Sequence, residues 1–148
     1  MTQLEKERTN TEAGKVLYTA RTRTAGGREN GTSRSCDGRL DVQLSVPGSA
    51  RIGTNPEQLL AAGWSACFES AIRQAARERK LALPGDPAIY AEVDLHLGDG
   101  GYSLSARLNV SLPGVEHSLA RSLVVEAHRI CPYSKAMRNN IEVAIEVV

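Results

Sequence analysis

The alternation of apolar and polar residues predicts short β-strands in the first third of the chain. Residues 15–24 and 40–46 alternate with a period of two, which is typical of strands with one covered face. The first run ends at Gly26-Gly27, and Asn30-Gly31 and Asp37-Gly38 are dipeptides that favour tight turns. This part of the chain is therefore predicted to form an antiparallel meander.

A long amphipathic helix is predicted to begin at Asn55. This residue is a good N-cap, Pro56 is favoured at the first helical position, and Gln58 stands where a capping box places a glutamine. The helix should become charged at residues 77–80 and stop before Pro84. Its apolar positions follow a single helical stripe: Leu60, Trp64, Cys67, Phe68, Ala71, Ile72 and Ala75.

The second half of the chain adds a hairpin and another helix. Residues 88–97 and 102–112 flank a glycine-rich turn and are predicted to pair as two long strands. Residues 115–130 have the period of an amphipathic helix. Cys131-Pro132 should interrupt that helix before a short one over residues 132–138.

A final alternating run, residues 141–148, predicts one more strand, so the element order is βββ, α, ββ, α, β. No internal repeat is visible, and a single α+β domain with an antiparallel sheet and two main helices is the expected fold. We assign residues 1–14 to a polar N-terminal extension and residues 15–148 to the domain.

Composition and charge exclude several functions. The 148 residues are 41% hydrophobic, enough for a core without metals or multiple disulfides. The 18 basic and 17 acidic residues form no polybasic run, which argues against nucleic acid or anionic membrane as a partner. Neither a signal peptide nor a run of the ~20 apolar residues that span a membrane is present, so we expect a cytoplasmic protein.

The three cysteines, Cys36, Cys67 and Cys131, suit neither a secreted disulfide framework nor a paired zinc motif. The histidines have no metal-ligand spacing and no nucleotide-binding motif occurs, so we expect no metal and no bound cofactor. In a reducing cytosol these cysteines are either core thiols or reactive ones.

Each cysteine has a structural interpretation beside the functional one. Cys67 lies on the buried stripe of its helix and could be a small core residue. Cys131 stands at a helix break, where free N–H groups of the short helix could stabilise a thiolate. His128, one turn earlier, could act as its base, although a satisfied surface histidine is the simpler interpretation.

Five ordered segments give the sequence a family resemblance. Gly26-Gly27-Arg28, residues 53–59, residues 61–68 and residues 127–134, together with residues 16–20, resemble the organic hydroperoxide resistance subfamily of the OsmC-like family. The resemblance covers the chain from Lys15 onward. It implies an intertwined homodimer in which antiparallel sheets wrap two long central helices.

The resemblance also implies an activity and a site. It implies a two-cysteine peroxidase that reduces alkyl or fatty-acid hydroperoxides, with Cys67 as the peroxidatic and Cys131 as the resolving cysteine, and with Arg28 and Glu57 in support. The implied reductant is external, the dithiol of a lipoylated protein. Trp64 and Phe68 are then expected to line an apolar substrate groove.

The proposed chemistry needs a thiolate, and a cation is the most direct means to obtain one. Arg28 would supply it and Glu57 would hold Arg28, although Glu57 could be an ordinary first-turn acid and Arg28 a solvated loop residue. Glu57 and Cys67 are ten residues apart, about 15 Å along a straight helix. Either the helix breaks near Gly63 or a second chain supplies Glu57.

Two other functions compete with the peroxidase. One is a non-enzymatic redox sensor that works through a Cys67–Cys131 disulfide. The other is a cysteine hydrolase or acyl carrier with His128 as the base. Trp64, Glu69 and Asn139 depart from the residues usual in the family, and Cys36 is interpreted as a bystander.

Overall fold

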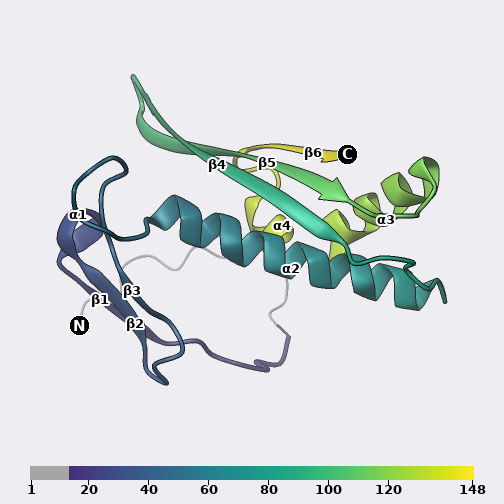
Figure 1. Cartoon of the computed structure of the whole chain (residues 1–148), viewed down its shortest axis with the longest axis horizontal. Coiled ribbons are helices and arrows are strands. Elements are labelled where there is room, and N and C mark those ends of the chain that lie inside the picture. The colour runs from purple at the N-terminus through teal and green to yellow at the C-terminus, as the bar shows by residue number, and fades with distance from the viewer. Residues whose placement is uncertain (1–13) are drawn as a thin grey trace.

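A computed structural model describes residues 14–148 and shows two unequal parts joined through the start of the longest helix (Figure 1). The smaller part is an N-terminal sheet of β1 (Thr22–Ala25), β2 (Thr32–Ser35) and β3 (Asp41–Gln43), with the single-turn helix α1 (Gly27–Asn30) between the first two strands. The strands pair antiparallel in chain order. The predicted meander is confirmed.

The first predicted strand is much shorter than the sequence pattern indicated. Pairing begins at Thr22, and residues 14–21 have no regular structure. Val16, Leu17 and Tyr18 are 75%, 91% and 78% exposed. The alternation is present in the sequence, but a strand also requires a neighbour to accept its backbone hydrogen bonds, and no segment of residues 14–148 pairs with this one. Residues 1–13 of the predicted extension lie outside the described residues.

Helix α2 (Pro56–Glu78) is the axis of the molecule and begins where the sequence predicts. The side chain of Asn55 accepts a hydrogen bond of 2.9 Å from the backbone N–H of Gln58. The Gln58 side chain instead accepts from Thr54, at 2.7 Å, so only half of the predicted capping box forms. The predicted stripe is confirmed in its buried members, which are Trp64, Phe68, Ala71, Ile72 and Ala75.

A second sheet covers α2. Strands β4 (Ala88–Gly98) and β5 (Gly101–Ser111) form the predicted hairpin, and β6 (Glu142–Val147) pairs with β5. The predicted antiparallel pairing is confirmed for β4 and β5, whereas β6 pairs with β5 in parallel, so the second sheet is mixed. The chain runs back along the sheet through two helices before β6, which is the long connection that parallel strands need.

These two helices are α3 (His117–Ile130) and α4 (Pro132–Met137), separated at Cys131 as predicted. Asn139, in the turn that leads to β6, has a φ of 63°. Asparagine tolerates this left-handed conformation better than most residues, which explains how it can stand where the family usually has glycine.

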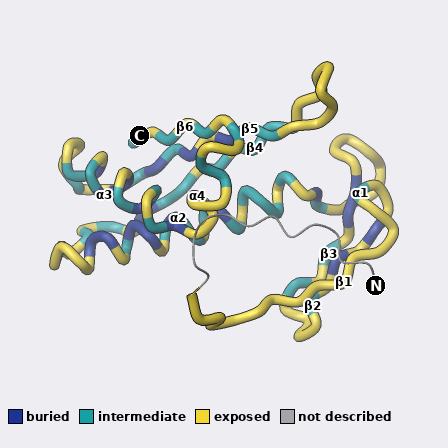
Figure 2. Tube along the Cα trace, turned by 180° about the vertical axis from the view of Figure 1, so that it is seen from behind, coloured by how far each residue is buried: buried dark blue, intermediate teal, exposed yellow. Residues whose placement is uncertain are grey.

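The hydrophobic core lies between α2, α3 and the inner face of the second sheet. Figure 2 shows the buried residues concentrated there, whereas the N-terminal sheet is mostly exposed. The buried residues of this core all lie at or after Trp64 in the sequence. Of the helices that the structure describes, none has the length and apolarity to cross a membrane.

Candidate active site

The fold brings Cys67 and Cys131 together from positions 64 residues apart in the sequence (131 minus 67). Cys67 lies near the middle of α2 and is partly exposed, while Cys131 is fully buried where α3 ends and α4 begins. The two thiols are neighbours, close enough for Cys131 to affect the pKa of Cys67, and both are reduced. Neighbouring thiols in one chain are the arrangement that an intrachain disulfide requires.

The surroundings of Cys67 raise the pKa of its thiol. Burial is the main cause, and the neighbouring Cys131 thiol raises the pKa further, while the backbone N–H of Tyr133 lowers it by hydrogen bonding. The sequence suggested that the first N–H groups of α4 would serve Cys131; the Tyr133 N–H serves Cys67 instead. No positive charge from residues 14–148 contributes to this pKa.

The cation predicted for the site lies elsewhere in the chain. Arg28 donates from Nη2 to both carboxylate oxygens of Glu57, at 3.0 and 2.8 Å. Gly26 and Gly27, with φ of 85° and 70°, form the left-handed turn that starts α1 and presents Arg28. Glu57 is only 15% exposed, in the first turn of α2, and Arg28 is 39% exposed. The predicted pairing of these two residues is present.

The ion pair and the thiol pair are separate within one chain. Helix α2 continues through Gly63 without a break, so the alternative in which the helix breaks there is wrong. Glu57 and Cys67 are consequently about 15 Å apart along the helix axis. Neither Arg28 nor Glu57 reaches Cys67 inside this chain.

Gly63 has a packing reason to be a glycine. A glycine inside a helix costs about 1 kcal/mol of stability relative to alanine. A Cβ atom at this position would lie 2.5 Å from Oη of Tyr133 and 2.9 Å from its Cζ. The tyrosine ring of α4 therefore lies directly on the backbone of α2, one turn before Cys67.

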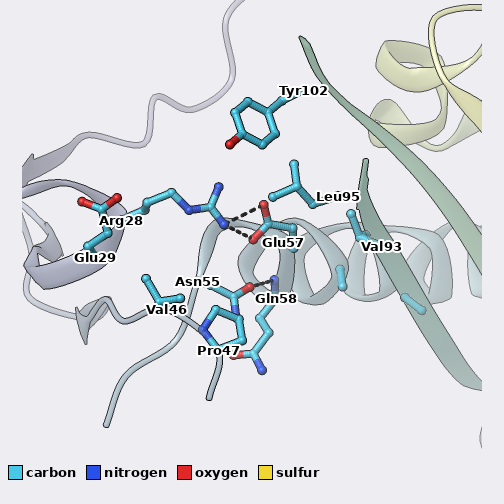
Figure 3. Close-up of a pocket in the computed structure, with 12 residues that line it drawn as sticks. Arg28, Glu29, Val46, Pro47, Asn55, Glu57, Gln58, Val93, Leu95 and Tyr102 are labelled. Atoms are coloured by element: carbon cyan, nitrogen blue, oxygen red, sulfur yellow. Dashed lines mark hydrogen bonds and ion pairs between the residues drawn. The ribbon is translucent and has the colours of Figure 1, made fainter. Parts of the chain in front are cut away.

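A cavity of about 820 Å³ opens beside the ion pair. Figure 3 shows Arg28 and Glu57 on one side, with Leu95 and Tyr102 of the β4–β5 hairpin facing them. Val46 and Val93 add apolar surface to the wall. The cavity thus combines a charged pair with an apolar lining.

Trp64 and Phe68 do not line this cavity, which corrects the expectation that they form an open groove. Both are fully buried in the core. The Trp64 Nε1–H donates to Oγ of Ser134 at 3.1 Å, a buried bond between α2 and α4. Sequence analysis missed this contact, whose only signal was the position of Ser134 three residues after the helix break.

His128 does not act as a base for Cys131 in this arrangement. Its Nδ1 is buried and has no hydrogen-bond partner among residues 14–148, so the interpretation as a satisfied surface histidine is also wrong. Burial, and then the charge of Arg138, lower the pKa of this imidazole. From Gly14 to Val148, no group of three His, Cys, Asp or Glu side chains is arranged to hold a metal ion.

The other residues singled out by the sequence lie away from the thiols. Cys36 is exposed at the end of β2. Glu69 forms an ion pair with Arg73, which also contacts Asp86 at 3.2 Å and so ties α2 to the loop before β4. These contacts give Glu69 a structural role.

The sequence model described as "OsmC-like protein" matches residues 47–146, which include α2, both cysteines and the second sheet. The protein therefore belongs to the OsmC-like family.

Relatives narrow this assignment to the organic hydroperoxide resistance proteins. The chain is 44% identical over 135 residues to the organic hydroperoxide resistance protein of Xanthomonas axonopodis pv. citri, covering 88% of this chain and 94% of that one. It is 40% identical over 136 residues to OhrA of Bacillus subtilis, with 88% and 96% covered. A crystal structure of an organic hydroperoxide resistance protein from Legionella pneumophila superposes with a TM-score of 0.84 at 42% identity, covering 90% and 98%.

Proposed function

We propose that this protein is a thiol peroxidase that reduces organic hydroperoxides to alcohols. The observation that carries the proposal is the contact between the Cys67 and Cys131 thiols. A partly exposed thiol can meet a substrate, and a buried thiol beside it can resolve the product before further oxidation. The names of the relatives, which describe resistance to organic hydroperoxides, support this reaction.

The reaction consists of three balanced steps. The Cys67 thiolate attacks the terminal peroxide oxygen, the O–O bond breaks, and the leaving alkoxide takes a proton to become the alcohol. Cys67 is then a sulfenic acid, which condenses with the Cys131 thiol to give a disulfide and water. A dithiol reductant then reduces the disulfide by two exchanges, which restores both thiols and leaves the reductant as its own disulfide.

A homodimer is part of the proposal because one chain leaves the site without a cation. The pKa of Cys67 is raised, mainly by burial, and the Arg28–Glu57 pair is about 15 Å along α2 from that thiol. We propose that the ion pair of a second copy completes each site. There Arg28 would stabilise both the thiolate and the charge that develops on the alkoxide.

The substrate class follows from the cavity beside the ion pair. Its walls include Val46, Val93, Leu95 and Tyr102, beside the Arg28–Glu57 pair and Glu29. Such a lining suits an alkyl or fatty-acid chain that carries a hydroperoxide better than it suits hydrogen peroxide.

The reductant and the location of the protein complete the proposal. We propose that a lipoylated protein supplies the dithiol in the cytoplasm, as the family resemblance implies. Electrons then come from an external partner, so the cycle needs no bound cofactor.

The test compares anaerobically prepared wild type, Cys67→Ser, Cys131→Ser and the control Cys36→Ser. Each is assayed with cumene hydroperoxide or hydrogen peroxide, and with dihydrolipoamide or glutathione. We expect wild type and Cys36→Ser to turn over the organic peroxide with the dithiol, and Cys67→Ser to be inactive. Cys131→Ser should react once and then accumulate sulfinic acid, visible by mass spectrometry.

The same assay separates the peroxidase from the sensor. Slow oxidation of wild type without turnover in excess dithiol would contradict the peroxidase and favour a redox sensor. Full activity of Cys67→Ser would contradict the assignment of the attacking thiol.

A further inference from the structure

Helix α4 carries two groups that act on Cys67, the Tyr133 backbone N–H and, at its N-cap, the Cys131 thiol. The helix is only six residues long, so its own hydrogen bonds do little to fix its orientation. Contacts with the neighbouring helices α2 and α3 therefore help to set where these groups point. Two side chains of α4, those of Tyr133 and Ser134, contact α2.

The Tyr133 contact is the closer of the two to the reacting thiol. Three atoms of the Tyr133 ring lie within 3.3 Å of the place where a Cβ of residue 63 would be. Gly63 has no left-handed φ, so its backbone conformation does not require glycine. The missing side chain is what matters, because a Cβ at residue 63 would force the end of the Tyr133 side chain to shift from its place on α2.

Gly63 and Cys67 are four residues apart and lie on the same face of α2. The ring of Tyr133 thus lies on that face one turn before the point where its own N–H meets Cys67. One residue therefore lies against α2 twice, by its side chain and by its backbone N–H.

We propose that the contact between the Tyr133 side chain and the backbone of Gly63 aligns the first turn of α4 with α2. It thereby holds the Tyr133 N–H and the Cys131 thiol on Cys67. Gly63 and Tyr133 are positioning residues for the thiol chemistry, and in that role the inference rests on the proposed function.

The Trp64–Ser134 hydrogen bond does not have this positioning role. It connects the same two helices within the core, where both residues are fully buried. Its loss should weaken the fold without turning the Tyr133 N–H away from Cys67. The two contacts can therefore be separated by experiment.

The test uses Gly63→Ala, Tyr133→Ala and the double variant, all in a Cys36→Ser background. The exposed Ser70→Ala on the same helix is the matched control. The readout is the pH dependence of Cys67 alkylation by iodoacetamide, followed by peptide mass spectrometry. It needs no peroxide, so it remains informative if the peroxidase proposal fails.

We expect each single variant to move the alkylation midpoint of Cys67 away from the wild-type value, because the Tyr133 N–H and the Cys131 thiol both act on its pKa. Disulfide formation after one equivalent of cumene hydroperoxide should slow about tenfold. Because Gly63 acts only through the ring, the double variant should match Tyr133→Ala alone. Ser70→Ala and Ser134→Ala should keep the wild-type profile.

Stability distinguishes positioning from general damage. Alanine is the better helix former, so Gly63→Ala should melt within a few degrees of wild type. If Gly63→Ala does not fold, Tyr133→Ala tests the same contact. Wild-type alkylation profiles in both single variants, or additive shifts in the double, would overturn the inference.

Discussion

Nη2 of Arg28 lies 3.0 and 2.8 Å from the two carboxylate oxygens of Glu57. The contact joins residues 29 positions apart and connects α1, between β1 and β2, to the first turn of α2. An arginine held in this way keeps its remaining N–H groups free for a ligand. The pair is therefore suited to bind a developing negative charge.

Removal of this cation should slow peroxide reduction without unfolding the protein. We expect Arg28→Met to lower kcat/KM for cumene hydroperoxide about a hundredfold, and Glu57→Gln about tenfold, because Glu57 only holds the arginine. The exposed Arg34–Asp41 pair, at 2.9 Å, provides the matched control. Equal losses in Arg34→Met and Arg28→Met would show that the effect is not specific to the site.

Co-expression can show whether the ion pair acts on the other chain. Cys67→Ser and Arg28→Met chains with different tags are co-expressed, and the mixed dimer is isolated by both tags. If each site takes Arg28 from the partner, the mixed dimer has one complete site and about half of the wild-type activity. If both residues act within one chain, the mixed dimer keeps only the residual activity of Arg28→Met, about a hundredth of wild type or less.

The Trp64–Ser134 bond should contribute measurably to stability. Ser134→Ala leaves the buried Trp64 N–H without a partner, and we expect it to lower the free energy of unfolding by about 1–3 kcal/mol. Urea unfolding followed by circular dichroism measures this change. Ser70→Ala, exposed on the same helix, should stay within about 0.5 kcal/mol of wild type.

The buried face of His128 should make the protein less stable in mild acid. Burial lowers the pKa of His128, so the unfolded chain takes up its proton at a higher pH than the folded chain does. This contribution to stability is complete above about pH 6.5 and is lost as the pH falls through the lowered pKa.

His128→Leu should therefore lose less stability than wild type between about pH 7.5 and 5.5, as measured by urea unfolding at each pH. His96→Gln, on the exposed part of β4, is the control. An unchanged slope in His128→Leu would exclude this histidine as the source of the acid sensitivity.

The elements with strong periodicity could be predicted from the sequence. Helix α2, the β4–β5 hairpin and the break at Cys131 carry their own signals in caps, turns and repeating apolar positions. The parallel pairing of β6 and the unpaired residues 14–21 could not be predicted. Both depend on which partner a strand finds, and alternation alone does not specify a partner.

The thiol site was only partly accessible to sequence reasoning. The family resemblance pointed to Cys67 and Cys131, and helix geometry predicted the separation of Glu57 from Cys67. The burial of Trp64 and the contact of Tyr133 with Gly63 were missed. Both features arise from the packing of α4 on α2. A local sequence pattern does not predict how two helices 50 or more residues apart pack together.

The placement of the core gives the two halves of the chain different local stability. The thiols stand on helices that pack into the main apolar cluster, whereas Arg28 stands on α1, which joins two strands of the small sheet outside that cluster. Backbone amides of β1–β3 should exchange with solvent through local opening, at a lower free energy than those of α2, α3 and β5, which exchange only on global unfolding. Cys67 and Cys131 therefore lie in the most stable part of the molecule, whereas Arg28 lies in the part that unfolds locally at the lowest free energy.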